Sequence, residues 1–413
     1  MKPKLPRGRA SMAASLASAA GIGALFSAGC ASAASFVQTN LVTDSQTYLA
    51  SAGFSAAATQ DPALINPWGM DHTPTGAWFI VNNGNQGSGT GKSTGGFYTG
   101  AGVKQSSVTI PQTAVGSMGA GAPTGPTGVV YNPSTSQFII ADLDGHLSTL
   151  NFGATTSVEA AAGPTPQMGP PHSIYTGVAI GTLAGTTYLY GANNATGGID
   201  AYNPSFQLVS LGAGAFQAPA IAAGLAAFNV QNLNGDIWVT YALPGPGSDT
   251  APIGAGAVAE FTTGGQLITS FTDPLHMASP WALAIAPSGF GAFGGDVLVG
   301  NFSHDDDPSL QDAFINAYNP LTGAYAGTLD DAQGNPIQLP GLWQIEAGNN
   351  GDAGSSSNLY FAAGIGDEQH GLFGYLSSAV PEPATWGMMI AGFGGIGLSA
   401  RRRRRRRLGI LAA

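Results

Sequence analysis

The sequence has a single cysteine and almost no basic residues outside its two ends. Cys30 lies within the first 34 residues, so the rest of the chain forms no internal disulfide, no cysteine-ligated zinc site and no cysteine nucleophile. Between residues 10 and 400 the only basic residues are Lys92 and Lys104, whereas all 23 Asp and Glu residues lie there. A body this acidic repels nucleic acid and anionic lipid, and it attracts cations such as Ca²⁺.

Recognisable catalytic and nucleotide-binding motifs are missing too. The six His residues are dispersed and form no HExxH pair, and no GxSxG stands where a strand turns into a helix. The stretch GNQGSGTG, residues 84–91, has no strand–turn–helix context for binding phosphate. What the chain has in abundance is glycine (62) and proline (27), scattered between short apolar runs. This pattern predicts many turns and short strands, and therefore an all-β fold.

The first 34 residues have the features of a secretory signal peptide. A basic start, MKPKLPRGRA, precedes a weakly apolar run, and ASAAS then offers small residues at the spacing of a cleavage site. We expect export through the Sec translocon, with cleavage near Ala33 or Ala34. Because SAGC places Gly before Cys30, lipid attachment at this cysteine is an alternative.

The other end of the chain combines an apolar segment with a run of arginines. Residues Thr385 to Ala400 are mostly apolar, but the segment is short for a spanning helix, which needs roughly 17–25 residues. Trp386 would lie at the membrane interface, and Arg401 to Arg407 would stay in the cytoplasm. We therefore predict a transmembrane sorting helix rather than a solvated or nucleic-acid-binding tail.

The stretch VPEPATWGMMIAGFGGIGLSARRRR resembles the PEP-CTERM sorting signal in its order of Pro-Glu-Pro, apolar segment and Arg cluster. The resemblance implies a signal over residues 379–408. It further implies transient anchoring at the inner membrane of a Gram-negative bacterium and processing by an exosortase. The final place would be the cell surface or the extracellular exopolysaccharide or biofilm matrix. The residues that carry the signal are Pro381, Glu382, Pro383, Trp386, Arg401, Arg402 and Arg403.

Between these two segments the chain repeats six times. The first strand of each repeat reads PWGM (67), PTGV (126), YTGV (175), AFNV (227), PWAL (280) and LWQI (342), about 50 to 60 residues apart. A second and a third short strand follow each of them, as in WFIVNN and GGFYTG. A repeat of short strands at such a period predicts the blades of a propeller.

A fourth strand follows in five of the repeats only. These strands are SSVTI, TSVEAA, QLVSL, QLITSF and AYAGTL, whereas the sixth repeat runs straight into the sorting signal. An orphan strand, SFVQTNLVTD, stands before the first repeat. We therefore predict a six-bladed β-propeller over residues 35–378, closed by this N-terminal strand, which removes an open sheet edge. An array of β-sandwiches is the competing interpretation.

The body also resembles a bacterial family of propeller proteins with no established activity. The resemblance rests on LINPWG, SPWALAIAPSGFGAFGGDVLVGNF, INAYNPLTGAYAGTL and AAGIGDEQHGLFG, and it covers nearly the whole predicted domain. It implies the propeller fold, but it assigns no catalytic residues.

Asn and Asp residues gather where first strands begin and second strands end. Because both positions lie on one face of a propeller, we predict a ligand site at that end of the central channel, with Ca²⁺ or Mg²⁺ as the fitting cation. The alternative is purely local, since Asn and Asp favour turns and bond their own backbone. The candidates are Asn66, Asn82, Asp142, Asn193 and Asn301, with Asn83, Asp144, His172, Asn194 and Ser279 beside them.

Three further groups have weaker claims to function. HDDDPSLQD, an insertion in the fifth repeat, offers Asp305, Asp306, Asp307 and Asp312 to a cation, but it lacks the glycine and glutamate of an EF-hand. GDEQHG places Asp367, Glu368 and His370 together in a loop, where acid–base work is conceivable. The third group, Trp68, Trp281 and Trp343, recurs at one blade position, and we expect these residues to pack in the core or the channel.

Two functions remain open from the sequence. The favoured one is an exported binding or scaffold protein of an exopolysaccharide or biofilm matrix, because no catalytic constellation is present. The alternative is a metal-dependent hydrolase, such as a lactonase, that uses the Asn and Asp residues of the channel end. The fold does not choose between them, because propellers host both classes.

Overall fold

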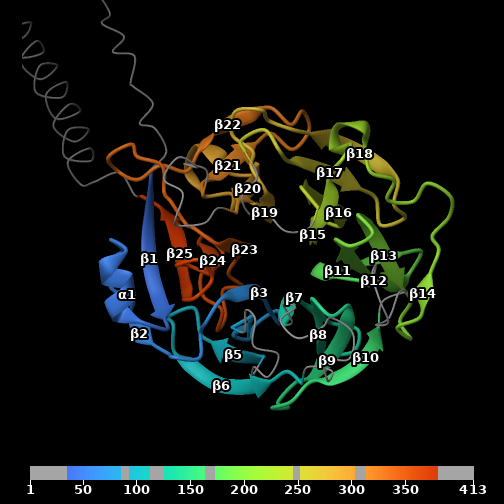
Figure 1. Ribbon diagram of the computed structural model, residues 1–413. Coiled ribbons are helices and arrows are strands. Elements are labelled where there is room, and N and C mark those ends of the chain that lie inside the picture. The colour runs from blue at the N-terminus through green and yellow to red at the C-terminus, as the bar shows by residue number, and fades with distance from the viewer. Residues whose placement is uncertain are drawn as a thin grey trace, which may run out of the picture. The chain divides into compact units, whose positions relative to one another are not determined.

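The computed structural model describes residues 35–84, 93–111, 125–162, 173–244, 252–302 and 313–379. The chain divides into two compact units, Met1–Ser32 and Ala33–Ala413, and every described residue belongs to the second. In that unit, six β-sheets surround a central channel (Figure 1). The predicted all-β, six-bladed propeller is thereby confirmed.

Each of the first five blades is a four-stranded antiparallel sheet, and the strands follow one another from the channel outward. Blade 1 holds β3 (Pro67–His72), β4 (Trp78–Asn82), β5 (Thr94–Tyr98) and β6 (Lys104–Thr109). Blade 2 holds β7 (Pro126–Asn132), β8 (Gln137–Asp142), β9 (His146–Asn151) and β10 (Val158–Ala162). Blade 3 holds β11 (Tyr175–Leu183), β12 (Thr186–Asn193), β13 (Gly198–Tyr202) and β14 (Leu208–Val209). Blade 4 holds β15 (Ala226–Leu233), β16 (Asp236–Ala242), β17 (Ala257–Phe261) and β18 (Leu267–Phe271). Blade 5 holds β19 (Pro280–Ile285), β20 (Val297–Asn301), β21 (Ile315–Tyr318) and β22 (Tyr325–Thr328).

The sixth sheet combines the two ends of the described chain. Its strands are β23 (Leu342–Ala347), β24 (Leu359–Ala363), β25 (Leu372–Ser378), β1 (Phe36–Thr43) and β2 (Thr59–Gln60). The N-terminal β1 pairs antiparallel with the C-terminal β25, from Phe36 opposite Ser378 to Thr43 opposite Leu372. Figure 1 shows these two strands, in blue and red, side by side. That the ring depends on this pairing for its closure stays a prediction.

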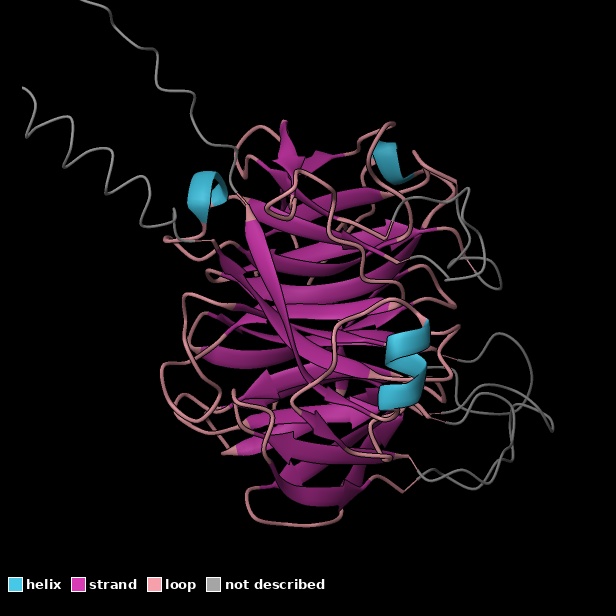
Figure 2. Cartoon of the chain, turned by 90° about the vertical axis from the view of Figure 1, so that its left-hand side faces the viewer, coloured by secondary structure: helices cyan, strands magenta, loops and turns pink. Residues whose placement is uncertain are grey.

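The innermost strands form the wall of the channel. Each of them contacts the innermost strand of the next blade, and β23 of blade 6 contacts β3 of blade 1. Three short helices, α1 (Gln46–Ser51), η1 (Ala220–Ala222) and η2 (Gly291–Phe293), complete the described secondary structure. In the side view of Figure 2 they lie outside the stacked sheets.

The apolar runs of the sequence become the second strands because both of their faces are covered by neighbouring blades. All residues of β4, β20 and β24 are buried, whereas β6 and β18 at the rim are largely exposed. Aromatic side chains join adjacent blades. The rings of Phe79 and Phe138 lie 5.1 Å apart between blades 1 and 2. Each fully buried side chain of this size contributes roughly 1.5–3 kcal/mol, so the interfaces between blades carry much of the stability.

Several predictions concern residues outside the described part of the chain. The signal peptide, the Pro-Glu-Pro, the apolar segment and the arginines all lie there, and so do the candidates His172, Asp305, Asp306, Asp307 and Asp312. Among the described residues, no helix has the length and apolarity needed to cross a membrane. The limits of the propeller domain at 35 and 378 stay a prediction.

Candidate functional site

One end of the channel is filled with aromatic side chains. Every innermost strand has a β-bulge near its start, after the first paired residue in five strands and after the second in β15, and a bulge redirects the side chain that it carries. The residues at the six bulges are Trp68, Thr127, Thr176, Phe228, Trp281 and Trp343. We call the four aromatic residues among them the aromatic plug. This end, where the innermost strands begin, is the plugged end.

The rings of the aromatic plug pack directly on one another. Trp68 stacks on Trp343 at 3.6 Å between ring centroids, and Trp281 meets Trp343 edge-on at 4.1 Å. Phe228 packs on Trp281 at 3.9 Å. All four are at most 5 % exposed. The expectation that the three recurring tryptophans pack in the channel is confirmed, and Phe228 holds the same position in blade 4.

Glycine lets the blades approach closely beside the plug. Gly69 follows Trp68, and a Cβ at this residue would lie 2.7 Å from the backbone nitrogen of Val129 in blade 2. Gly128 holds the same position in blade 2, where a Cβ would lie 2.8 Å from the nitrogen of Val178. A larger residue would push neighbouring blades apart at both places.

The predicted Asn and Asp residues lie at the plugged end and bond mainly within their own blades. Asn82, Asp142, Asn193 and Asn301 are the last residues of second strands, each opposite the first residue of the innermost strand. The Asn301 side chain accepts from the Ala278 nitrogen (3.2 Å) and donates to the His276 carbonyl (2.8 Å). Asn193 accepts from the nitrogen of Ile174 in the same way. At the position opposite the residue that precedes the bulge, blade 4 carries Tyr241 and blade 6 carries Ala363.

Asn66 is the member of this group that links two blades. Its Nδ2 donates to Glu368 Oε2 (3.0 Å), and its Oδ1 accepts from the Trp343 indole (2.8 Å). Its backbone is left-handed, with φ of 47°, a conformation that Asn tolerates better than most residues. Glu368 comes from the predicted loop between β24 and β25, in which His370 contacts Asp44 (2.7 Å). That Asn66, Asn82, Asp142, Asn193 and Asn301 form a ligand site stays a prediction.

One buried group at the plugged end has the spacing of metal ligands. Atoms of Asp142, Asp144 and His146 lie within 4.8 Å of one another, and all three residues are buried. Asp142 Oδ1 also accepts from the backbone nitrogens of Asp144 and His146. Burial raises the pKa of Asp142 well above its usual range, and the negative charge of Asp144 adds to this effect.

The other end of the channel is a cavity of about 310 Å³, which we call the open end. The residues three positions beyond the bulges all line it, one from each blade. They are Asp71, Val130, Ala179, Gln231, Ala284 and Glu346. In three blades this position is apolar, as packing between sheets requires. In blades 1, 4 and 6 it is polar or ionisable.

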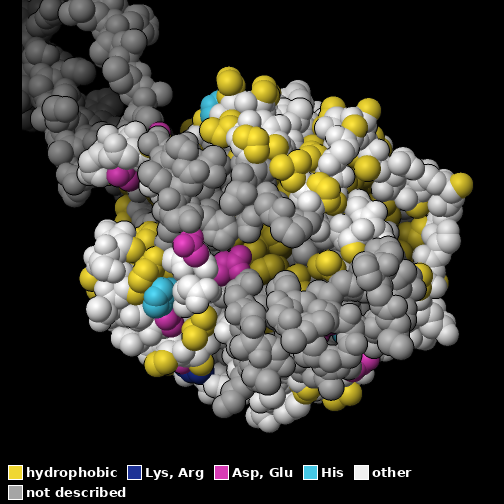
Figure 3. Space-filling model, viewed as in Figure 1, with side chains coloured by type: hydrophobic (Ala, Val, Ile, Leu, Met, Phe, Trp, Pro, Cys, Tyr) yellow, Lys and Arg dark blue, Asp and Glu magenta, His cyan; other side chains and the backbone are white. Residues whose placement is uncertain are grey.

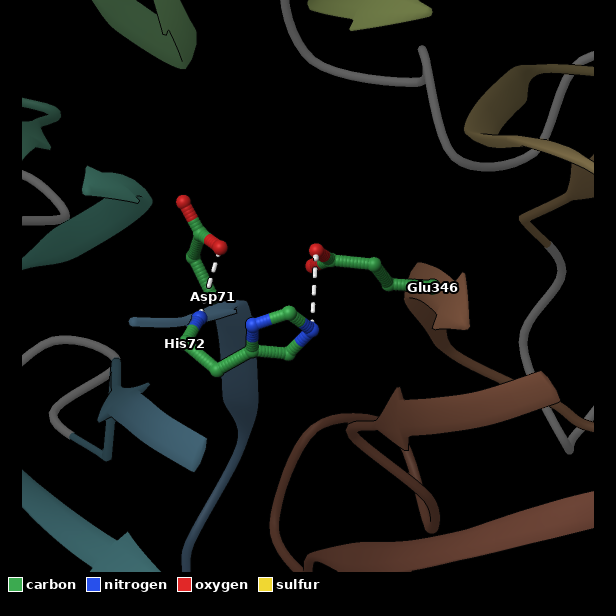
Figure 4. A group of neighbouring side chains, drawn as sticks. All are labelled: Asp71, His72 and Glu346. Carbon is green, nitrogen blue, oxygen red and sulfur yellow. Dashed lines mark hydrogen bonds and ion pairs between the residues drawn. The ribbon is translucent and has the colours of Figure 1, made fainter. Parts of the chain in front are cut away.

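Two carboxyl groups meet at this position, one from β3 and one from β23. Figure 4 shows Asp71 and Glu346 pointing toward each other from these strands, with His72 beside them. Asp71 accepts hydrogen bonds from the backbone nitrogens of His72 and Tyr131, both at 2.6 Å. One of its carboxylate oxygens and one of Glu346 lie within 4.8 Å of each other.

Of the two carboxyl groups, Glu346 has the more strongly raised pKa. Burial raises the pKa of Glu346 well above its usual range, and the neighbouring negative charge of Asp71 raises it further. Burial also raises the pKa of Asp71, although its backbone hydrogen bonds work in the opposite direction. The side chain of Glu346 is 30 % exposed, and its exposed part faces the cavity.

His72 completes this group with both ring nitrogens facing carbonyl oxygens. Its Nδ1 lies 3.0 Å from the Thr73 carbonyl oxygen, and its Nε2 lies 3.1 Å from that of Ala347 and 3.6 Å from Glu346 Oε1. Atoms of Asp71, His72 and Glu346 are within 4.8 Å of one another, a spacing that suits a metal, but the orientation of the ring does not.

The sequence reasoning missed Asp71, His72 and Glu346. The signal was present in PWGMDH and LWQIEA, once the six first strands are aligned on their bulges. The alignment places these carboxyl groups where other blades carry Val130, Ala179 and Ala284. An ionisable residue at a position that faces a neighbouring sheet is unexpected for packing alone.

Figure 3 shows the charge pattern on one face of the molecule. Acidic side chains lie beside hydrophobic ones near the middle of the ring, and Lys and Arg are scarce. This agrees with the strongly acidic composition of the body.

Comparison with known protein families finds a sorting motif at the C-terminus. Residues 379–405 match the PEP-CTERM protein-sorting motif. The chain therefore carries a sorting signal that implies export, anchoring in a membrane and processing by an exosortase. No curated protein matches the chain.

Solved structures similar to the chain are distant. A streptogramin B lyase is 11 % identical, with a TM-score of 0.42, over 83 % of this chain and 97 % of that one. Virginiamycin B lyase from Staphylococcus aureus is 14 % identical, with a TM-score of 0.43, over 83 % and 98 %. The WD40 domain of Neurospora crassa Pan2 is 9 % identical, with a TM-score of 0.45, over 84 % and 96 %. Similarity at this level says nothing of activity.

Proposed function

We propose that the exported propeller is a binding or scaffold protein and that the cavity at the open end is its ligand site. The observation that carries this proposal is the ring of residues three positions beyond the bulges. All six line one cavity, and three of them are polar in a layer that packing would make apolar. A concave site with apolar walls and a few convergent polar groups is the usual form of a small-molecule site.

The place of action follows from the sorting motif. We place the mature protein at the surface of a Gram-negative bacterium, or in the exopolysaccharide or biofilm matrix around it, after export through the Sec translocon. The resemblance of the C-terminus to sorting signals of such bacteria supports this, and so does the acidic, cysteine-free body.

A panel of sugars, amines and carboxylic acids tests the cavity as the ligand site. A ligand that binds the folded protein raises its melting temperature, and at about 100-fold excess over Kd it adds about 2.7 kcal/mol of stability. We expect at least one compound to stabilise the full chain in a non-ionic detergent and to lose this effect in Gln231→Leu. A panel with no effect, or an equal effect on both proteins, would contradict the proposal.

A metal-dependent hydrolase, of the lactonase type or another, is the second candidate function. It is favoured by the group of Asp142, Asp144 and His146, because carboxylates and imidazole are suitable ligands for a catalytic cation such as Ca²⁺, Mg²⁺ or Zn²⁺. Asp305, Asp306, Asp307 and Asp312 remain weaker candidates for a metal.

Elemental analysis decides between the two functions. One tightly held divalent ion, lost on chelation together with stability or with hydrolysis of a lactone panel, would support the hydrolase. Asp142→Asn should then lose the ion. A metal-free protein with an unchanged melting curve after chelation would leave the binding function alone.

A further inference from the structure

Packing does not explain why two carboxyl groups lie together at the open end. Asp71 and Glu346 come from different blades and are both ionisable, and both line the cavity. Replacing buried ionisable groups by apolar residues of similar size is often neutral or stabilising. Val130, Ala179 and Ala284 show that apolar residues fit the same layer.

The directions of the lone pairs on Asp71, His72 and Glu346 indicate what kind of ligand these residues can bind. Both nitrogens of His72 face carbonyl oxygens, so the ring is not directed toward a metal. Each oxygen of Asp71 already accepts one backbone N–H and keeps one lone pair. Glu346 adds two oxygens whose lone pairs face the cavity once its proton leaves. A compact cation that donates several hydrogen bonds fits these acceptors, and an ammonium group has three donors.

A second, independent feature lies in blade 4. Gln231 occupies the same layer of the cavity, three blades around the ring from Asp71. Its Oε1 is buried and has no hydrogen-bond partner among the described residues. A buried acceptor without a partner is unfavourable, so a ligand that reaches across the cavity with a donor would satisfy it.

Resting on the proposed function, we infer that the cavity binds a small ligand through an ammonium group held by Asp71 and Glu346, with a hydroxyl or N–H donor reaching Gln231. The ammonium stabilises the charged forms of both carboxyl groups, so a proton held by Glu346 leaves to solvent when the ligand binds. The cavity volume of about 310 Å³ is at the lower end of small-molecule sites, ~300–1,000 Å³. An amino sugar combines the ammonium, the hydroxyl groups and the small size.

The inference also gives a direction for the pH dependence. The titratable residues among those that line the cavity are Asp71 and His72 from β3 and Glu346 from β23, and β7 contributes only the backbone nitrogen of Tyr131. A proton on Glu346 competes with the ammonium group. Affinity should therefore rise with pH until Glu346 has lost its proton or the amine loses its own.

Calorimetric titration with a matched pair of sugars tests the inference. The full chain in a non-ionic detergent is titrated with glucosamine and with N-acetylglucosamine at about pH 6.5, below the pKa of an ordinary amine. We expect glucosamine to bind about tenfold or more tightly than its neutral acetylated form, since a hydrogen bond between charged groups is lost in the latter. Glu346→Gln should weaken glucosamine by a similar factor.

Glu260→Gln is the matched control. Glu260 lies on β17, away from the cavity, so this variant removes the same charge and should leave the affinity unchanged. Equal binding of the two sugars, or preference for the acetylated one, would overturn the ammonium inference and leave the cavity as a binding site. Binding of neither sugar overturns the inference as well. The proposed function then fails only if the wider panel also finds no ligand.

Discussion

The two ends of the channel are built from the same six strands but hold opposite kinds of side chain. At the plugged end, Trp68, Phe228, Trp281 and Trp343 pack ring on ring and fill the space. At the open end, three positions further along, two carboxyl groups and an amide line a cavity. The plugged end follows packing rules and explains stability. The open end departs from them, and such departures are where function is expected.

The largest expected loss of stability comes from a substitution in the aromatic plug. Trp281→Ala removes a ring that contacts Trp68, Phe228 and Trp343, and truncation of a buried aromatic residue costs about 3–5 kcal/mol. Urea unfolding would measure the loss. Phe152→Ala is the control, because Phe152 is 73 % exposed and its truncation should change little. A stable Trp281→Ala protein would mean that the plug does not support the ring.

The two carboxyl groups of the open end should respond differently to removal. Asp71→Leu leaves the nitrogens of His72 and Tyr131 without their acceptor, and an orphaned buried donor costs roughly 1–3 kcal/mol. Glu346→Leu removes no backbone partner, so the free energy of unfolding should stay the same or increase. Chemical unfolding of both variants at neutral pH measures their free energies of unfolding. The comparison separates a structural role of Asp71 from a binding role of Glu346. A large loss of stability in Glu346→Leu would show that Glu346 is structural.

The open end should also make stability depend on pH. The pKa of Glu346 is raised well above 4.5 in the folded protein, so folding favours its protonated form. The stability that the folded protein gains from this raised pKa is fully present below about pH 4.5. It is lost as the pH rises through the pKa of Glu346 in the folded protein. The melting temperature of the wild type should therefore fall more than that of Glu346→Gln between about pH 5 and about pH 9. Asp142 has a raised pKa in both proteins, so the difference reports on the pair of Glu346 and Asp71. Parallel curves would contradict the expectation.

The smallest effect is expected from the polar residues of the plugged end. Asn301→Ala loses the bonds to Ala278 and His276, but Ala363 of blade 6 shows that alanine fits this position. We expect a loss of about 1 kcal/mol and unchanged ligand affinity, measured by melting and titration on the same sample. A strong loss of affinity with little loss of stability would instead support the predicted ligand site at Asn66, Asn82, Asp142, Asn193 and Asn301.

The fold was predictable because it depends on repetition. The number of blades could be predicted from six aligned apolar strands, their turns and the spare N-terminal strand. The fourth strands of blades 1 to 5 could be predicted in the same way. The tryptophans were also placed correctly, because one aromatic residue recurs at one blade position. Asp71, His72 and Glu346 were not found, because a site of two blades and one histidine shows no local motif. The six first strands, as aligned in the sequence, already place Asp71 and Glu346 directly after PWGM and LWQI, but only the structure shows that this position lines a cavity.

The most direct test is a crystal structure of the protein soaked with glucosamine. The ammonium group should lie within hydrogen-bond distance of Asp71 and Glu346 at the open end, with a hydroxyl group near Gln231. Sugar bound instead over Asn66 and Asn301 at the plugged end, with the cavity unoccupied, would contradict the division of the channel into a structural end and a binding end.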